Sequence, residues 1–125
     1  MIQEICLAPR NSLVLIMDQT VGEVPENMGQ SLLAATRSCI AIGTRSETDG
    51  QTRISLSDEK PFGIPNEPPV FDGVIPTPSK MLTVCSVLDE SLLALSVLHS
   101  NTRVQIWAND RIEPDRIWIV GSKAG

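Results

Sequence analysis

Short segments in which every second residue is apolar recur along this chain at intervals of about ten residues. Such alternation places the apolar side chains on one face of an extended strand, so it predicts β structure. The segment 12–17 is apolar almost throughout, as expected of a strand buried on both faces. We therefore expect an all-β fold, an antiparallel β-sandwich of about seven or eight short strands. The strand-like segments are 12–17, 38–44, 51–57, 70–75, 81–87, 91–97, 102–108 and 116–120.

Turn residues between these segments predict two hairpins. The dipeptide Asp49-Gly50 separates 38–44 from 51–57, and residues 88–90 separate 81–87 from 91–97. Two helical alternatives remain open. Helix-forming residues make a short helix near 28–36 possible, and 89–99 could form a helix with Asp89 as N-cap. For 89–99 we favour a strand, because the segment lies at hairpin distance from strong strands.

Residues 59–80 contain six of the nine prolines of the chain. Proline lacks the N–H donor that a central strand requires, and Pro68-Pro69 excludes a helix. Apolar residues at 70–75 argue against a flexible linker, which would be rich in glycine and serine. We predict an edge strand inside a proline-rich crossover loop, within a single domain that spans 1–125. Two halves of about 60 residues would be marginal as independent domains.

Composition limits the classes of partner. Fifteen acidic and ten basic residues give a net charge of −5, which argues against nucleic acid and against anionic membranes as partners. No signal peptide and no apolar run long enough to span a bilayer is visible. Three cysteines form no CxxC pair, and Cys39 and Cys85 lie in apolar runs. We expect three reduced thiols, two of them buried, and a cytoplasmic location.

Residues that commonly carry catalysis are scarce. His99 is the single histidine, and nucleophilic catalysis by serine or cysteine usually needs an imidazole base. Its neighbours Ser100 and Asn101 instead indicate a solvated turn. The spacings typical of zinc, calcium and phosphate sites are missing. We predict a protein that is not an enzyme, with no catalytic residues, no metal and no cofactor.

Acidic residues at strand ends and in loops suggest a protein-binding role, because carboxylates can cover the cationic site of a basic partner. Trp107 and Trp118 would be interface anchors if their sheet face is open to solvent. The alternative, which we favour, is that both fill a core on the second face of the sheet. The predicted contact residues are Asp58, Glu59, Asp89, Glu90, Asp110, Glu113, Asp115, Trp107 and Trp118.

The order of several stretches resembles one known family. NSLVLIMDQ, SCIAIGTRSETDGQTRISLSDEKP, PSKMLTVCSV, ALSVLHSNTRVQIWANDR and RIWIVGS are similar to small bacterial β-sandwich proteins of the competence protein J type, inhibitors of a DNA-entry nuclease. The chain departs from that pattern at 99–102, where the family has Pro-Gly, and it lacks the final LWP. The resemblance implies a β-sandwich and an inhibitor or immunity-like role toward a nuclease-like partner. It carries no functional residue across.

Two other functions stay open. A pocket between the sheets would make the protein a binder of small molecules. The slightly positive mean hydropathy of +0.05 is also compatible with a homo-oligomeric structural protein, such as a homodimer, in which a second copy covers apolar strand surface.

Overall fold

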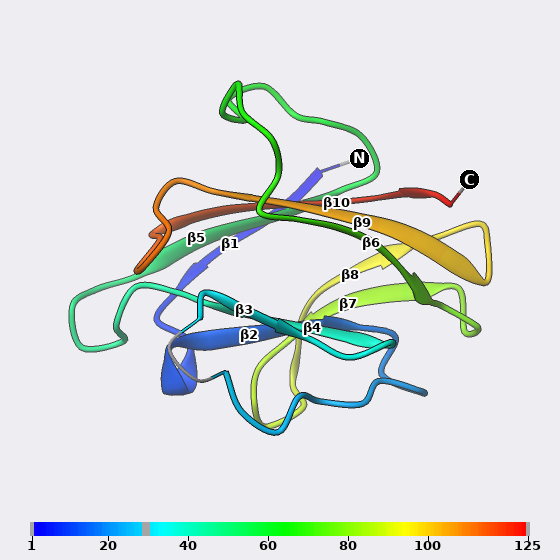
Figure 1. Ribbon diagram of the computed structural model, residues 1–125, viewed down its shortest axis with the longest axis horizontal. Coiled ribbons are helices and arrows are strands. Elements are labelled where there is room, and N and C mark those ends of the chain that lie inside the picture. Colours follow the sequence, from blue (N-terminus) through cyan, green and yellow to red (C-terminus); the bar gives the residue numbers. More distant parts are fainter. Residues whose placement is uncertain (1, 29–30, 125) are drawn as a thin grey trace.

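The computed structural model describes residues 2–28 and 31–124 and consists of two five-stranded sheets packed face to face (Figure 1). We call them sheet A and sheet B. In spatial order, sheet A contains β1 (Ile2–Leu7), β5 (Thr52–Ser57), β10 (Arg116–Lys123), β9 (Asn101–Ala108) and β6 (Phe71–Pro76). Sheet B contains β3 (Leu33–Ala35), β4 (Cys39–Gly43), β2 (Leu13–Met17), β7 (Met81–Cys85) and β8 (Ser91–Ser96). The predicted all-β sandwich is confirmed.

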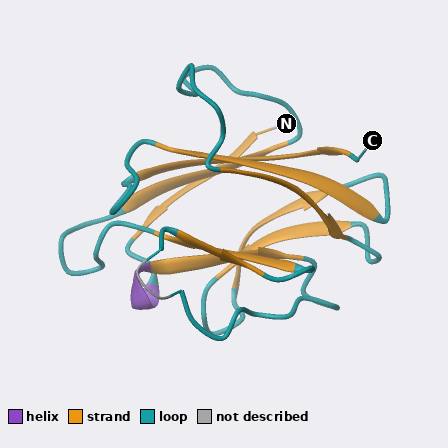
Figure 2. Cartoon of the chain, in the orientation of Figure 1, coloured by secondary structure: helices purple, strands orange, loops and turns teal. Residues whose placement is uncertain are grey.

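Helical structure in the described residues is limited to one 3-10 turn, Arg10–Ser12, drawn purple in Figure 2. No helix in this part of the chain is long and apolar enough to cross a membrane. Strand pairing is antiparallel except between β5 and β10, which run parallel.

The core between the sheets is almost entirely aliphatic. Each strand contributes alternate residues, such as Val14 and Ile16 from β2, Ile54 from β5 and Ile106 from β9, all with no exposed surface. Alternation in the sequence therefore specified which side chains face inward, because successive side chains of a strand point to opposite faces.

The outer face of each sheet also carries a small apolar cluster. On sheet B, Leu15 and Met17 pack with Cys39, Ala41 and Cys85. This second cluster makes β2 buried on both faces, as predicted. Cys39 and Cys85 are both buried, and Cys6 is exposed; all three thiols are free. Burial raises the pKa of the Cys39 thiol to about 11, so this thiol is protonated and unreactive at neutral pH.

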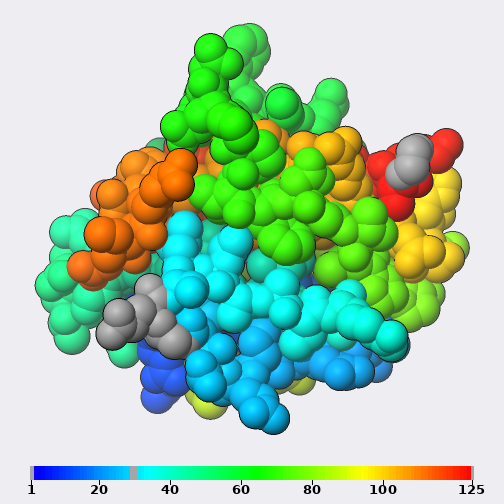
Figure 3. Space-filling view, viewed as in Figure 1, coloured from blue at the N-terminus to red at the C-terminus, as the bar shows by residue number. Residues whose placement is uncertain are grey.

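On sheet A, Trp107, Trp118 and Val120 form the outer cluster, against which Ile64 packs. Ile64 belongs to the proline-rich loop, which rises above the outer face of sheet A (green in Figures 1 and 3). The loop leads into β6, which lies at the edge of sheet A as predicted, and the chain then crosses to β7 in sheet B.

Two local predictions were wrong. The segments on either side of Asp49-Gly50 do not form a hairpin, because β4 belongs to sheet B and β5 to sheet A. A turn dipeptide shows that the chain reverses, but not whether the two strands pair. The helix near 28–36 is also wrong in its described part, since Leu33–Ala35 forms β3 and pairs with β4; residues 29–30 lie outside the described residues. Strand pairing here outweighs helix propensity.

The described residues contain ten strands, more than the seven or eight expected. β1 was not predicted, although Ile5 and Leu7 alternate toward the core. β3 is only three residues long, too short for a recognisable alternation. In contrast, the hairpin of β7 and β8 is confirmed, and Ser91–Ser96 is a strand.

Candidate functional site

The predicted contact carboxylates lie in three separate loops. Asp58 and Glu59 follow β5, Asp89 and Glu90 lie between β7 and β8, and the others lie between β9 and β10. Because Arg53 pairs with Arg116 and Ser57 with Val120, the first and third loops lie at opposite ends of sheet A. The carboxylates therefore do not form one continuous patch.

The loop between β9 and β10 packs against the loop between β4 and β5. Three backbone N–H groups of the β4–β5 loop and the start of β5 donate to it: Arg45 to the Pro114 carbonyl (2.7 Å), Ser46 to Glu113 Oε1 (3.1 Å) and Arg53 to the Asp115 carbonyl (2.8 Å). The two loops lie side by side in Figure 3, orange beside blue-green. We call this end of the molecule the acidic pole. It consists of Arg45, Glu47, Asp49, Asp110, Arg111, Ile112, Glu113 and Asp115.

The acidic pole is held in one conformation by its own side chains. Asp110 Oδ2 accepts the backbone N–H groups of Ile112 and Glu113, at 3.2 and 2.8 Å. The hydrogen bond from Glu113, followed by that from Ile112, holds the pKa of Asp110 below its ordinary value. Asn109 donates to Asp115 Oδ1 (2.6 Å) and accepts from the Asp115 and Arg116 backbones. Ile112, in the same loop, is 79% exposed.

The other predicted carboxylates have local partners. Gln19 Nε2 donates to Asp89 Oδ1 at 3.1 Å, and the Ser86 hydroxyl lies 3.3 Å from Glu90 Oε1. The first contact ties the β7–β8 loop to the segment that follows β2, and the second lies within that loop. The carbonyl of Glu59 accepts from the Ser57 hydroxyl at 2.7 Å. Asp58 and Glu59 are both exposed.

The two tryptophans are adjacent partners on β9 and β10 and are buried, with 2% of Trp107 and 7% of Trp118 exposed. Trp107 Nε1 donates to the Glu67 carbonyl of the proline-rich loop (3.0 Å), and Lys60 Nζ lies 5.0 Å from the centre of the ring. This arrangement agrees with the alternative in which the tryptophans fill a second core. A partner would reach them only after the loop has moved, and their role as anchors stays a prediction.

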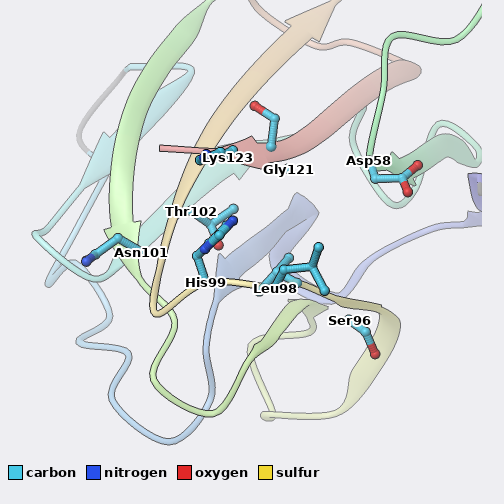
Figure 4. A pocket seen from close by; sticks show the side chains of 10 residues that line it. Asp58, Ser96, Leu98, His99, Asn101, Thr102, Gly121 and Lys123 are labelled. Carbon is cyan, nitrogen blue, oxygen red and sulfur yellow. The ribbon is translucent and has the colours of Figure 1, made fainter. Parts of the chain in front are cut away.

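A cleft of about 270 Å³ lies at the opposite end of the molecule from the acidic pole. Figure 4 shows Leu98 and His99 on the β8–β9 turn beside Gly121 and Lys123 of β10. His99 is exposed on this turn, as expected, and its carbonyl accepts from the Thr77 hydroxyl at 2.9 Å. Among the described residues, no three His, Cys, Asp or Glu side chains are placed to hold a metal ion.

Sandwiches of this kind define a class of fold rather than an activity. At the level of sequence, no protein-family model and no curated protein matches the chain. Two solved structures match it in fold. ComJ from Bacillus subtilis, an inhibitor of the DNA-degrading activity of NucA, superposes with a TM-score of 0.69, 9% identity and 99% coverage of both chains.

The second structure, described as crocagin biosynthetic gene J, superposes with a TM-score of 0.55, 15% identity and 96% coverage of both chains. These likenesses confirm the fold that the sequence resemblance implied. At such identities they show the fold alone.

Sequence reasoning did not identify the part of the acidic pole that comes from residues 45–49. The stretch SETDG carries two carboxylates, but its position next to the β9–β10 loop depends on β5 pairing in parallel with β10.

Proposed function

We propose that this protein is a non-enzymatic binding protein that inhibits a basic partner enzyme by covering its cationic site with the acidic pole. The observation that carries the proposal is the junction of two loops far apart in sequence, joined by backbone hydrogen bonds into one exposed surface. Five carboxylates and two arginines lie on it, together with the exposed Ile112.

Two physical properties make this surface suitable for binding a protein. Its carboxylates accelerate encounter with a positively charged partner and select against negatively charged ones. Its loops already have a fixed conformation, so little conformational entropy is lost when a partner binds. Ile112 supplies an apolar contact that becomes desolvated at the centre of the interface.

The likeness to ComJ supports the proposal, because the same fold serves as an inhibitor of a nuclease there. A nuclease is a reasonable partner on physical grounds too, since an enzyme that binds polyphosphate carries a cationic groove. We also propose a cytoplasmic location, in keeping with three free thiols.

The test is capture of a partner by immobilised protein from a lysate of the source organism, elution with rising salt, and calorimetry with the purified partner. The double variant Glu47→Lys/Asp49→Lys reverses two charges of the acidic pole without removing an internal contact of the β9–β10 loop. Glu23→Lys/Glu26→Lys is the matched control, because both side chains are exposed on the segment after β2.

We expect the acidic-pole variant to weaken binding at least tenfold and to flatten the dependence of affinity on salt. Ile112→Ser should weaken binding with the salt dependence unchanged. If the two double variants weaken binding equally, or if neither does, the acidic pole is not the contact surface.

A further inference from the structure

Three buried polar atoms on the outer face of sheet A have no hydrogen-bond partner among the described residues: Ser55 Oγ, Arg116 Nη1 and Trp118 Nε1. They lie together. Ser55 on β5 is the register partner of Trp118 on β10, and the Arg116 guanidinium stacks 4.6 Å from the centre of the Trp118 ring. Ser55 is 1% and Trp118 7% exposed. A buried polar atom without a hydrogen-bond partner destabilises a fold, so three in one place indicate a binding site.

The chemistry of these atoms specifies what they bind. An indole N–H and a guanidinium can only donate hydrogen bonds, and a hydroxyl can donate as well as accept. A ligand that satisfies all three must therefore offer several acceptor oxygens close together. Carboxylate and phosphate groups have this property, and arginine is the side chain that matches their geometry best.

A second arginine lies beside the first, because Arg53 and Arg116 are register partners on β5 and β10. One carboxylate faces both: Glu4 Oε1 lies 3.7 Å from Arg53 Nε and 3.4 Å from Arg116 Nη2. Burial lowers the pKa of Arg116, and the charge of Arg53 lowers it further, against the opposing effect of Glu4. Because one carboxylate faces two arginines, the group keeps a net positive charge.

The contacts of Glu4 are loose, and its side chain is 44% exposed. An ion pair with this exposure contributes little to stability, so Glu4 can turn into solvent at low cost. Arg53 lines two open grooves: one is shared with Glu4, Ile5 and Cys6, the other with Cys6, Gln51, Asp115 and Arg116. The carboxylate of Asp115 is already engaged by Asn109 Nδ2.

We propose that Arg53, Ser55, Arg116 and Trp118 form a binding site for an oxyanion, a carboxylate or a phosphate group, and that Glu4 competes with this ligand for the two arginines. On binding, Glu4 turns outward, and the oxyanion accepts from the Trp118 indole, the Ser55 hydroxyl and the two guanidinium groups. The site lies on the face of sheet A and adjoins the acidic pole at Asp115. None of its four residues belongs to the acidic pole, so neither proposal depends on the other.

Two tryptophans make this site directly observable by nuclear magnetic resonance, because the ¹⁵N–¹H spectrum contains only two indole signals. The full chain would be titrated with inorganic phosphate and, separately, with acetate and citrate, with sodium chloride at matched ionic strength as the reference. We expect the indole signal of Trp118 to shift in a saturable manner and that of Trp107 to stay in place. Comparison of the anions decides between a phosphate and a carboxylate ligand.

Variants test the assigned contacts. Arg116→Lys and Ser55→Ala should each weaken anion binding roughly tenfold, since each removes a hydrogen bond to a charged group. Glu4→Gln should strengthen binding, because it removes the competing charge and leaves the fold intact. Arg103→Lys is the matched control, since Arg103 lies on the same sheet face and pairs with Asp72 instead.

Two results would overturn the proposal. One is a Trp118 signal that does not move with any of the three anions, or moves equally with chloride. The other is an unchanged affinity in both Glu4→Gln and Arg116→Lys, with native spectra showing that both variants are folded.

Discussion

Asp18 offers a sharp test of how this fold is held together. It follows β2, and only 1% of the residue is exposed. Its Oδ1 accepts the backbone N–H and the hydroxyl of Thr20, at 3.0 and 2.7 Å, and its Oδ2 accepts the backbone N–H of Ser79 at 2.8 Å. One carboxylate thereby joins the end of β2 to the turn that leads into β7. We predict that Asp18→Asn destabilises the protein substantially.

The magnitude follows from these contacts. Asparagine has the same shape, but it can accept on one side only, so its amide N–H₂ would face either the Ser79 N–H or the Thr20 donors. Loss of one hydrogen bond to a charged group, with a buried donor left unpaired, costs roughly 2–4 kcal/mol. For a domain of this size, that loss lowers the melting temperature by roughly 10 °C.

The loss should also depend on pH. Burial raises the pKa of Asp18, but the hydrogen bonds from Thr20 and Ser79 together outweigh it and hold the pKa below the ordinary 3.8. A carboxyl whose pKa is lowered on folding stabilises the fold above its unfolded pKa, and this contribution disappears as the pH falls through its folded pKa. The stability difference between wild type and variant should therefore be full at pH 5 to 7 and shrink at pH values below about 3.8.

Urea unfolding monitored by tryptophan fluorescence, repeated from pH 7 down to pH 3, measures the difference. Asp49→Asn is the control: Asp49 is exposed, and asparagine also suits a turn before glycine. If Asp18→Asn loses no more stability than Asp49→Asn, or if its loss is the same at every pH, this account of Asp18 is refuted.

Three further predictions follow from packing and from cross-strand contacts. Trp107→Phe removes the hydrogen bond to Glu67, and loss of this bond should lower the free energy of unfolding by about 1 kcal/mol. Limited proteolysis should then cut faster within 59–69; an unchanged pattern would mean that this hydrogen bond does not restrain the loop. Gly121→Ala would place a Cβ 2.8 Å from Leu82 Cδ2, and such overpacking should lower the free energy of unfolding by roughly 1–3 kcal/mol. Gly63→Ala is the control for backbone strain, because its Cβ would meet nothing within 4 Å although Gly63 has a φ of +91°. Gln3 joins the edge strands β1 and β8 by hydrogen bonds to the Ala94 N–H and carbonyl, so Gln3→Ala should expose the edge of β8 and promote association at high concentration; a light-scattering mass that remains that of the wild type would contradict this.

The candidate sites were less predictable than the fold, for a physical reason. The acidic pole forms only if residues 45–49 lie next to 109–115, and the oxyanion site forms only if Glu4, Ser55 and Trp118 lie together on one sheet face. Both arrangements depend on β5 lying between β1 and β10. Pairings between strands so distant in sequence leave no local pattern, because any strand with one apolar face can pair with several others.

What the sequence by itself determined is local. Alternation specified that the chain forms strands, and that Ile54, Val104 and Ile106 face the core, because the side-chain period of a strand is a property of the backbone. The prolines excluded helix and central strand from the loop before β6, because proline has no N–H to donate. Only the tertiary structure decided that this loop folds back over sheet A and buries Trp107 and Trp118. A side chain on the outer face of a strand can be covered by solvent, by a loop or by another chain. Which of these covers it depends on residues that lie far away in the sequence.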